Sequence, residues 1–233
     1  MITVLLCLLC LPILPLAAVV TDTKPQCVKL LTNCVGTLRQ FKHREMSDLD
    51  NILQPPYKHP QAVAGDLDND NDIDLCIGIW HEGAGFGKIL YFKNTGDFQK
   101  PIWEEQNGDK NPFLDIEEKR PAPLLLDVDN DSDLDLILGN RKGTIQYYLN
   151  TGTPSNPVYV KKIGINNPFN EIKMTSDSSP TAGDFDNDGD QDLVVGSGNA
   201  LLYYFKNIGT LTNPVYIPQI GTNNPFNGIK VLG

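Results

Sequence analysis

Short apolar runs separated by clusters of Asp, Asn, Gly and Pro recur along residues 58–233. Between residues 115 and 170, four such runs have the composition of strands, at 123–126, 136–138, 144–149 and 158–161. Turn-forming residues bound each run, as they bound strands in proteins. Asn150, Thr151 and Gly152 supply the turn between the last two runs, because Asn and Gly accept positive φ at little cost. Helical periodicity is absent, so the pattern predicts an all-β chain of short antiparallel strands.

The same pattern occurs three times in the chain. AGDLDNDNDIDLCIG, LLDVDNDSDLDLILG and AGDFDNDGDQDLVVG align without gaps, at residues 64–78, 125–139 and 182–196. Their first aspartates, Asp66, Asp127 and Asp184, are 61 and 57 residues apart. Four strands in a repeat of this length are typical of a β-propeller blade. The sequence therefore predicts β-propeller blades of four antiparallel strands, three of them recognisable, at about 58–114, 115–170 and 171–233.

Three blades do not close a ring, because propellers typically have four to eight. We therefore expect a partial or open propeller, completed by further blades or by another chain. The first repeat has five extra residues between Gly78 and Asn94, and its loop 80–87 is predicted to be a flexible surface insertion, with a long hairpin that contacts a ligand as the alternative. Trp80 in this insertion and Trp103 are candidate ligand contacts, although a core position is favoured for Trp103.

The N-terminus has the pattern of a signal peptide at residues 1–20. An apolar stretch interrupted by Pro12 and Pro15 ends at the small residues Ala17 and Ala18, and it is short for a membrane span. No Lys or Arg precedes the stretch, so a retained N-terminal anchor is the alternative. We expect a secreted or cell-surface protein with no membrane span after cleavage of the signal.

The cysteines fit an oxidising compartment. Residues 21–57 form an N-terminal segment that contains Cys27 and Cys34, a candidate disulfide pair, and that is expected to add an outer strand. Cys76 lies in the apolar run 75–77, where a buried thiol is expected rather than a reactive one.

Most of the acidity of the chain is concentrated in the three aligned stretches. The net charge is −10, yet 15 aspartates lie in the stretches 66–74, 127–135 and 184–192, so the rest of the chain is net positive. Nucleic acid is a poor partner for such clustered carboxylates, whereas a small cation is a good one.

Each acidic stretch has carboxylates at positions 1, 3, 5, 7 and 9. Two like charges about 4 Å apart repel by roughly 4 kcal/mol at an effective dielectric constant of 20, so the packed loop needs a cation. Ca²⁺ takes six to eight oxygen ligands, whereas Zn²⁺ favours His or Cys. An EF-hand requires Glu at position 12, where this chain has Ile77, Leu138 and Val195. The stretches therefore predict about three Ca²⁺ sites in β-hairpin turns.

The predicted metal ligands are the 15 aspartates of these stretches. They are Asp66, Asp68, Asp70, Asp72, Asp74, Asp127, Asp129, Asp131, Asp133, Asp135, Asp184, Asp186, Asp188, Asp190 and Asp192.

The D-x-D-x-D loop, the apolar triplet and Gly that follow it, and the Pro and Ala just before it resemble FG-GAP or VCBS-type repeats of integrin α-chain propellers. The resemblance covers about residues 58–233. It implies that side chains at positions 1, 3, 5 and 9 and the main-chain carbonyl at position 7 hold Ca²⁺. The Gly usual at position 6 is present only as Gly189, with Asn71 and Ser132 in the other loops. Because Ser accepts a left-handed backbone less readily than Asn, the second site departs most from the pattern.

The resemblance implies a binding or adhesion module that recognises a protein or glycan, with calcium stabilising the blade hairpins. A purely structural segment of a larger surface protein is the alternative, and a propeller-based hydrolase or lyase is the less favoured one. His43, His59 and His81 are dispersed and no nucleophile motif accompanies them, so we expect no catalytic activity.

Overall fold

The computed structural model describes residues 57–229 except 82, 84 and 98, and these residues belong to one compact unit, Pro55–Gly233. The predicted signal peptide and the predicted Cys27–Cys34 disulfide lie outside the described residues. Within the described part of the chain, no helix has the length and apolar character needed to cross a membrane.

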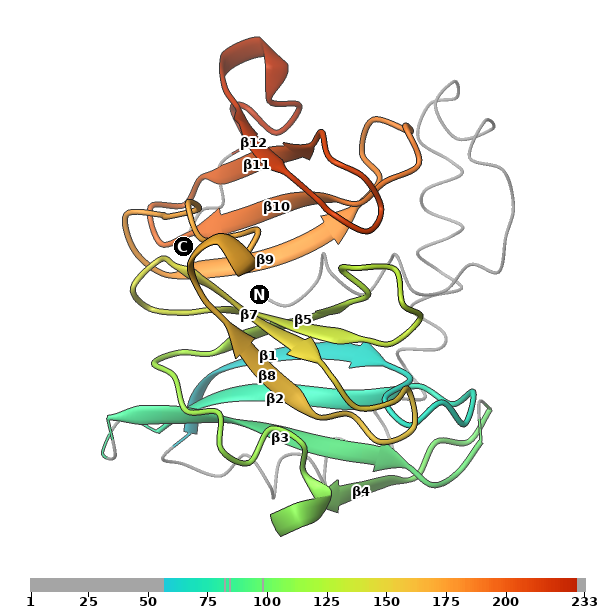
Figure 1. The fold of residues 1–233 in the computed structure, drawn as a ribbon. Helices are drawn as coiled ribbons and strands as arrows, with labels where there is room; N and C mark the ends of the chain where they lie inside the picture. Colours follow the sequence, from blue (N-terminus) through green and yellow to red (C-terminus); the bar gives the residue numbers. More distant parts are fainter. Residues whose placement is uncertain (1–56, 82, 84, 98, 230–233) are drawn as a thin grey trace, which may run out of the picture. The chain divides into compact units, whose positions relative to one another are not determined.

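Three four-stranded antiparallel sheets make up the fold, and each corresponds to one sequence repeat (Figure 1). Blade 1 contains β1 (Tyr57–Gly65), β2 (Asp74–His81), β3 (Phe86–Asn94) and β4 (Trp103–Gln106). Blade 2 contains β5 (Ala122–Leu126), β6 (Asp135–Gly139), β7 (Ile145–Asn150) and β8 (Tyr159–Lys162). Blade 3 contains β9 (Ser178–Gly183), β10 (Asp192–Ser197), β11 (Leu202–Asn207) and β12 (Tyr216–Gln219).

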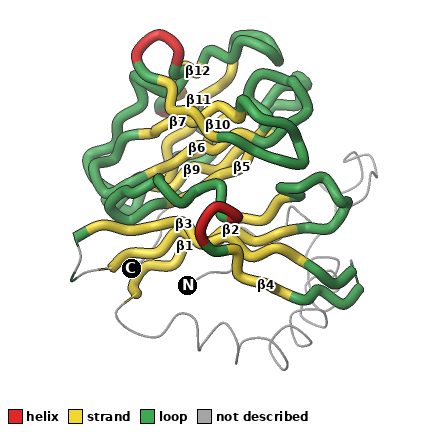
Figure 2. Tube along the Cα trace, turned by 60° about the horizontal axis from the view of Figure 1, so that its bottom comes forward, coloured by secondary structure: helices red, strands yellow, loops and turns green. Residues whose placement is uncertain are grey.

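Neighbouring strands in each sheet are also neighbours in the chain. Figure 2 shows strands and loops along nearly all of the described chain, with helical structure limited to short turns. These are the 3₁₀ turns η3 (Gly108–Lys110), η4 (Gly164–Asn166) and η5 (Gly221–Asn223). The prediction of an all-β chain with four antiparallel strands per repeat is confirmed.

The strand positions predicted for the second repeat are confirmed to within one residue. Residues 123–126 and 136–138 lie in β5 and β6, and residues 144–149 and 158–161 overlap β7 and β8. In all three blades an asparagine side chain closes the predicted turn after the third strand. Asn150 Oδ1 accepts hydrogen bonds from Gly152 N at 3.0 Å and Val158 N at 2.9 Å. Asn94 and Asn207 make the same pair of bonds.

The prediction that residues 80–87 form a surface loop with an exposed Trp80 is wrong. β2 continues to His81 and β3 begins at Phe86, so the extra residues lengthen two paired strands instead of the loop. The Trp80 side chain is 6% exposed, because its strand is buried along most of its length. Trp103 is half-buried at the start of β4.

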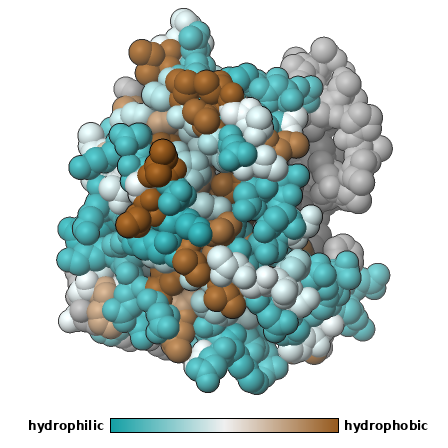
Figure 3. All heavy atoms as spheres, in the orientation of Figure 1, coloured by the Kyte–Doolittle hydropathy of each residue, from teal (hydrophilic) through white to brown (hydrophobic). Residues whose placement is uncertain are grey.

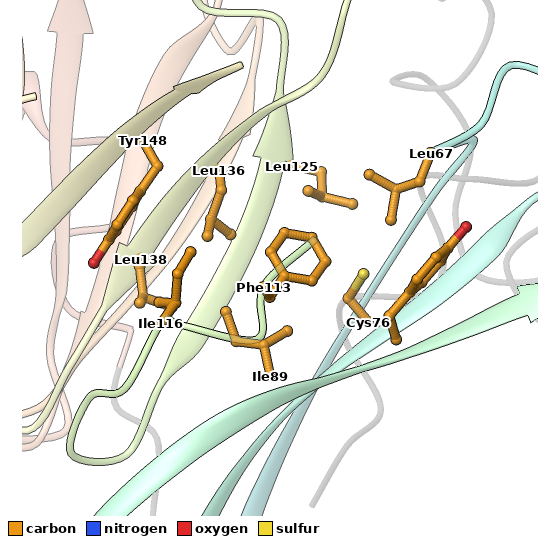
Figure 4. Close-up of a cluster of buried hydrophobic side chains, with 10 residues drawn as sticks. Leu67, Cys76, Ile89, Phe113, Ile116, Leu125, Leu136, Leu138 and Tyr148 are labelled. Carbon is orange, nitrogen blue, oxygen red and sulfur yellow. The ribbon is translucent and has the colours of Figure 1, made fainter. Parts of the chain in front are cut away.

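The apolar core lies between consecutive blades as well as within them. One cluster joins Leu67, Cys76 and Ile89 of blade 1 to Leu125 and Leu136 of blade 2. Figure 4 shows Phe113 in the middle of this cluster, with side chains of both blades around it. A second cluster joins blades 2 and 3 in the same way and is centred on Phe169. Burial of Cys76, at 1% exposed, agrees with its predicted core position.

The Asn-Pro-Phe triplet of each repeat places a phenylalanine against the next blade. Phe113 stacks on Tyr159 with ring centroids 4.9 Å apart, and Phe169 stacks on Tyr216 at the same distance. The asparagine two residues earlier holds each phenylalanine in place, as Asn111 does by accepting from Phe113 N and donating to the Ile89 carbonyl. Burying one such ring contributes about 2–3 kcal/mol.

Blade 3 has the same features but no following blade among the described residues. The Phe226 ring contacts the rings of Phe185 and Tyr204 in its own blade, and Phe226 is half-buried where Phe113 and Phe169 are buried. The described chain therefore has the open end that the predicted partial propeller requires.

Candidate functional site

The three acidic stretches are hairpin turns between the first two strands of each blade. We call residues 66–74 loop 1, residues 127–135 loop 2 and residues 184–192 loop 3. Each loop joins a pair of antiparallel strands, β1 to β2, β5 to β6 and β9 to β10. The residue at position 12 lies in a buried strand in every blade, at 4% exposed for Ile77 and 0% for Leu138 and Val195. The exclusion of an EF-hand is therefore confirmed.

The backbone at position 6 is left-handed in all three loops. Its φ is 70° at Asn71, 74° at Ser132 and 97° at Gly189. Position 4 is an asparagine with positive φ in every loop, 57° at Asn69 and 60° at Asn130. Asn and Gly adopt this conformation at low cost, which explains their recurrence in the loops. Ser132 adopts it too, so its substitution for Gly leaves the course of loop 2 unchanged.

The carboxylate at position 1 folds the loop around itself. In loop 2, Asp127 Oδ1 accepts a hydrogen bond from Asp131 N at 3.1 Å, and Asp127 Oδ2 accepts one from Ser132 N at 3.0 Å. Asp131 Oδ1 in turn accepts from Asp133 N at 3.1 Å. The corresponding bonds are present in loops 1 and 3. Positions 1 and 5 therefore both bind backbone N–H groups and face the inside of the turn.

This folding brings carboxylate oxygens of each loop close together. One oxygen from each of three aspartates lies within 4.8 Å of the others. The groups are Asp66, Asp68 and Asp74 in loop 1, Asp127, Asp129 and Asp131 in loop 2, and Asp184, Asp186 and Asp188 in loop 3. Every donor in these groups is an oxygen, which suits a hard divalent cation.

Positions 3 and 7 carry carboxylate oxygens that are inaccessible to water and have no hydrogen-bond donor. These atoms are Asp68 Oδ1, Asp129 Oδ1, Asp133 Oδ1 and Asp190 Oδ1. Asp133 as a whole is only 7% exposed. A buried carboxylate oxygen without a partner is unfavourable by several kcal/mol, so buried charges in proteins are normally paired or bound to a metal. The residues thus fit a cation among these oxygens.

The aspartate at position 9 has a role that the sequence did not reveal. Asp135 is 0% exposed, and its carboxylate accepts three hydrogen bonds. The donors are Val128 N at 3.2 Å, Tyr147 OH at 2.8 Å and Asn150 N at 2.6 Å. Asp74 and Asp192 are equally buried and accept from the equivalent donors in their blades. Position 9 therefore ties the loop to the third strand of its blade and keeps one further acceptor site.

The sequence contains a recurring pattern that could have indicated this role of position 9. The tyrosine and asparagine donors recur in every repeat, as Tyr91 and Asn94, Tyr147 and Asn150, and Tyr204 and Asn207. Their spacing matches the antiparallel pairing of the second and third strands, which places each tyrosine opposite the residue two positions after the aspartate and so within reach of its carboxylate.

The comparison with known families agrees with this geometry. Residues 127–195, from the first aspartate of loop 2 to the second strand of blade 3, match the model of the FG-GAP-like repeat. Residues 127–195 are therefore an FG-GAP-like repeat region. A comparison with curated proteins gave no match.

The electrostatics differ between the three loops. In loop 2, burial raises the pKa of Asp135 to about 7, and burial together with the charge of Asp131 raises the pKa of Asp133 to about 6. The pKa of Asp129 is raised as well, first by burial and then by Asp131 and Asp127. The folded loop therefore disfavours its own negative charges, and no lysine or arginine in the described part of the chain forms an ion pair with it.

In loop 1, a lysine ammonium lies against the carboxylates at positions 3 and 5. Lys93 Nζ on β3 donates to Asp68 Oδ2 and lies 3.1 Å from Asp70 Oδ2. The hydrogen bond to Asp68 is the main reason that the pKa of Lys93 is raised to about 12. The pKa of Asp70 is lowered, first by its bond from Asp72 N and also by Lys93.

Loop 3 of the FG-GAP-type repeats has the same arrangement. Lys206 Nζ on β11 donates to Asp186 Oδ2 and lies 3.0 Å from Asp188 Oδ2. The bond from Lys206 lowers the pKa of Asp188. Sequence reasoning missed both lysines, because the strand hairpin brings them to the loop from about 20 residues away.

Proposed function

We propose that this FG-GAP-type repeat protein binds Ca²⁺ in loops 1, 2 and 3, that the ions stabilise the blade hairpins, and that the protein serves outside the cell as a binding module. The observation that carries the calcium proposal is the set of buried, unpartnered carboxylate oxygens at positions 3 and 7. They lie in the loops whose aspartates converge within 4.8 Å. No hydrogen-bond donor among the described residues reaches these oxygens.

The ligands proposed for each ion follow from what each aspartate already does. Side chains at positions 1, 3 and 5 supply the converging oxygens in loops 2 and 3, and those at positions 1, 3 and 9 do so in loop 1. Position 7 would add its main-chain carbonyl, as the family resemblance implies. When bound, Ca²⁺ would supply charge neutralisation and a set of oxygen contacts across the turn.

Hydrogen bonds and the left-handed backbone of each loop fix its conformation without an ion. The backbone N–H groups of positions 5 and 6 orient the first carboxylate, and the left-handed residue at position 6 turns the chain back. Position 9 anchors the turn to the third strand. A cation joining positions 1, 3 and 5 would therefore couple loop closure to pairing of the blade strands, and binding would add to folding stability.

Thermal unfolding with calcium and with chelator tests this stabilising role. We expect the melting temperature to rise by several degrees in Ca²⁺ relative to EGTA, and cleavage in the loops by a protease to slow. Mg²⁺ at the same concentration is the control and should stabilise less, because it requires near-ideal octahedral geometry. Identical melting curves in Ca²⁺ and EGTA would contradict the proposed role.

The proposal of a non-catalytic module is supported by the state of the reactive groups. Cys76 is 1% exposed, and burial raises the pKa of its thiol, so it is a poor nucleophile. The hydroxyls of Tyr91 and Tyr147 donate to buried aspartates, and burial raises their pKa values. The aspartates of the acidic loops accept hydrogen bonds and are the proposed ligands of the ions.

The proposal of a protein or glycan ligand is supported by the family resemblance and by exposed apolar side chains on the 3₁₀ turns. Ile163 is 72% exposed, Ile165 99% and Ile220 80%. Figure 3 shows apolar groups as separate patches among polar ones on the visible face. A glycan array probed with the calcium-loaded protein tests the glycan class. Binding that Ile165→Ser abolishes would support a ligand site at η4, and an array without any binding would remove the glycan class.

The open face of blade 3 favours the second candidate, a structural segment of a longer array of blades. Loop position 2 is buried between blades at Leu67 and Val128, at 2% and 5% exposed, whereas Phe185 is 37% exposed. A further blade, of this chain or of another, would cover Phe185 and Phe226 as blades 2 and 3 cover Phe113 and Phe169.

A further inference from the structure

The residue before the turn asparagine of the third strand differs between the blades. It is Lys93 on β3, Leu149 on β7 and Lys206 on β11. In each blade the next residue donates its backbone N–H to the position 9 aspartate of the loop. This bond fixes the register of the strand against the loop, so the three side chains begin at equivalent places. The repeats therefore differ at this position. An ammonium group lies beside loops 1 and 3, and an apolar side chain occupies the equivalent place beside loop 2.

The ammonium group in loops 1 and 3 uses oxygens that a cation would use. Lys93 and Lys206 each contact Oδ2 of both position 3 and position 5. In loop 3 both carboxylates are among the converging ligands proposed above, and in loop 1 the position 3 carboxylate of Asp68 is. A divalent ion entering these loops must displace the ammonium group or lie close to its positive charge.

Loop 2 has no such group. No ion pair joins a carboxylate of loop 2 to a lysine or arginine that the structure describes. Leu149 instead packs against the apolar cluster between blades 2 and 3. Loop 2 also contains two of the unpartnered buried oxygens, one on Asp129 and one on Asp133. Asp133 is only 7% exposed, so more than nine-tenths of it is buried. The carboxylates of loop 2 are therefore the ones that the protein itself leaves uncompensated.

We propose that Lys93, Leu149 and Lys206 rank the three cation sites, so that loop 2 binds a divalent cation most tightly and the lysines weaken loops 1 and 3. This inference rests on the proposed calcium function. It reverses the expectation from Ser132, which marked the second site as the one that departs most from the family pattern.

The physical reason is the Coulomb interaction between the ammonium group and the ion. One positive charge beside the position 3 and position 5 oxygens reduces the attraction that those oxygens offer to Ca²⁺, whether the ammonium stays or leaves. At these short separations the effect on affinity is expected to be about tenfold or more after partial screening. The same charge partly stabilises loops 1 and 3 without a metal, so the ion is more important to the folding of blade 2.

Calorimetric titration of the chelator-treated protein with Ca²⁺ tests the ranking through exchange of the two residue types. We expect the wild-type protein to show one tight site and two weaker ones. Leu149→Lys should weaken the tight site by about tenfold or more, and Lys93→Leu should convert one weaker site into a tight one. Leu149→Met is the matched control, because it keeps an apolar side chain of similar volume, and it should leave all three affinities unchanged.

Single-loop variants assign the sites. Asp129→Asn should remove the tight site, whereas Asp68→Asn and Asp186→Asn should each remove a weaker one. Terbium luminescence, sensitised by the tyrosines that donate to the position 9 aspartates, gives a second measure of occupancy. Because Lys93→Leu and Lys206→Leu place no charge in the core, they test the ranking even where Leu149→Lys does not fold.

The outcomes separate this inference from the calcium function itself. Ca²⁺ uptake with equal affinities, unchanged in Leu149→Lys and in Lys93→Leu, would overturn the ranking and leave the calcium function standing. Weaker binding in Lys93→Leu would also overturn it, since it would mean that the lysine helps to hold the ion. Absence of any uptake by the wild-type protein would overturn both.

Discussion

The aspartates of one loop have different structural roles, although they are the same residue type. Asp127 and Asp131 bind backbone N–H groups, Asp129 has an unpartnered buried oxygen, and Asp135 accepts three bonds from elsewhere in the blade. Hydrogen-bonded carboxylates maintain the loop, and the unpartnered one leaves room for a cation. The aspartates therefore divide by position into those that also support the loop through hydrogen bonds and those, such as Asp129, that serve only as proposed ligands.

Replacing Asp135 and Asp129 separately tests this division. In EGTA, Asp135→Ala should reduce the free energy of unfolding by about 3 kcal/mol, because it leaves three buried donors without an acceptor. Asp129→Ala should leave it unchanged or increase it, because it removes a repelled charge. Urea unfolding of both variants measures the difference. Equal losses would mean that the two positions have the same role.

Much of the site could be predicted from residue types at this scale, and some of it could not. The alternating aspartates and the Asn and Gly between them indicated an oxygen-lined turn, because both depend on local chemistry. The contacts of Lys93 with Asp68 and of Tyr147 with Asp135 depend on which strands pair and in which register. Only the fold brings those residues together, so a linear pattern did not identify them.

At the scale of the element, the strands were predictable because polar clusters bound them on both sides. The prediction failed at residues 80–87. The glycines there favour a loop, but β2 and β3 pair as far as His81 and Phe86. Cross-strand pairing and burial of Trp80 outweigh the loop preference of the neighbouring glycines.

The contact between blades depends on glycines in the second strand of blades 1 and 2. A Cβ atom on Gly139 would lie 2.2 Å from the Ser178 carbonyl oxygen of blade 3, and one on Gly78 would lie 2.2 Å from the Pro121 carbonyl oxygen of blade 2. The equivalent Gly196 has no atom nearer than 3.7 Å, because no described blade follows it. Close approach of backbones is the physical reason for glycine at the first two positions.

Alanine substitution is expected to destabilise the protein at Gly139, which lies against the next blade, and not at Gly196, which does not. Gly139→Ala should destabilise the protein by about 1–3 kcal/mol, because blade 3 must move away from the new methyl group. Gly196→Ala, the matched control, should change stability by less than about 0.5 kcal/mol. Thermal unfolding of both variants in Ca²⁺ gives the comparison. A large loss in Gly196→Ala would contradict the open position of this strand.

At the scale of the whole molecule, the blades form a series in which each covers the phenylalanine of the one before. The series leaves Phe185 and Phe226 of blade 3 uncovered among the described residues. Apolar faces of this kind promote association. The sequence predicted the open end from the number of repeats, but not which side chains form it.

Sedimentation velocity tests whether this face takes part in assembly. The wild-type protein should self-associate as its concentration rises, and Phe185→Ser should shift it toward the monomer. Ile165→Ser removes an equally apolar side chain, 99% exposed on η4, and should leave the association unchanged. A wild-type protein that stays monomeric, or one that only Ile165→Ser disperses, would show that the open face is not the assembly surface.

The central claim concerns the buried oxygens of the three loops, and calcium uptake at equilibrium tests it most directly. Chelator-treated protein is titrated with Ca²⁺ in a calorimeter beside a variant that carries Asp68→Asn, Asp129→Asn and Asp186→Asn, the position 3 residues of the three loops. We predict saturable heat of binding for the wild-type protein and none for the triple variant at the same concentrations. Folded wild-type protein without such heat, or a triple variant that binds as the wild type does, would contradict the account.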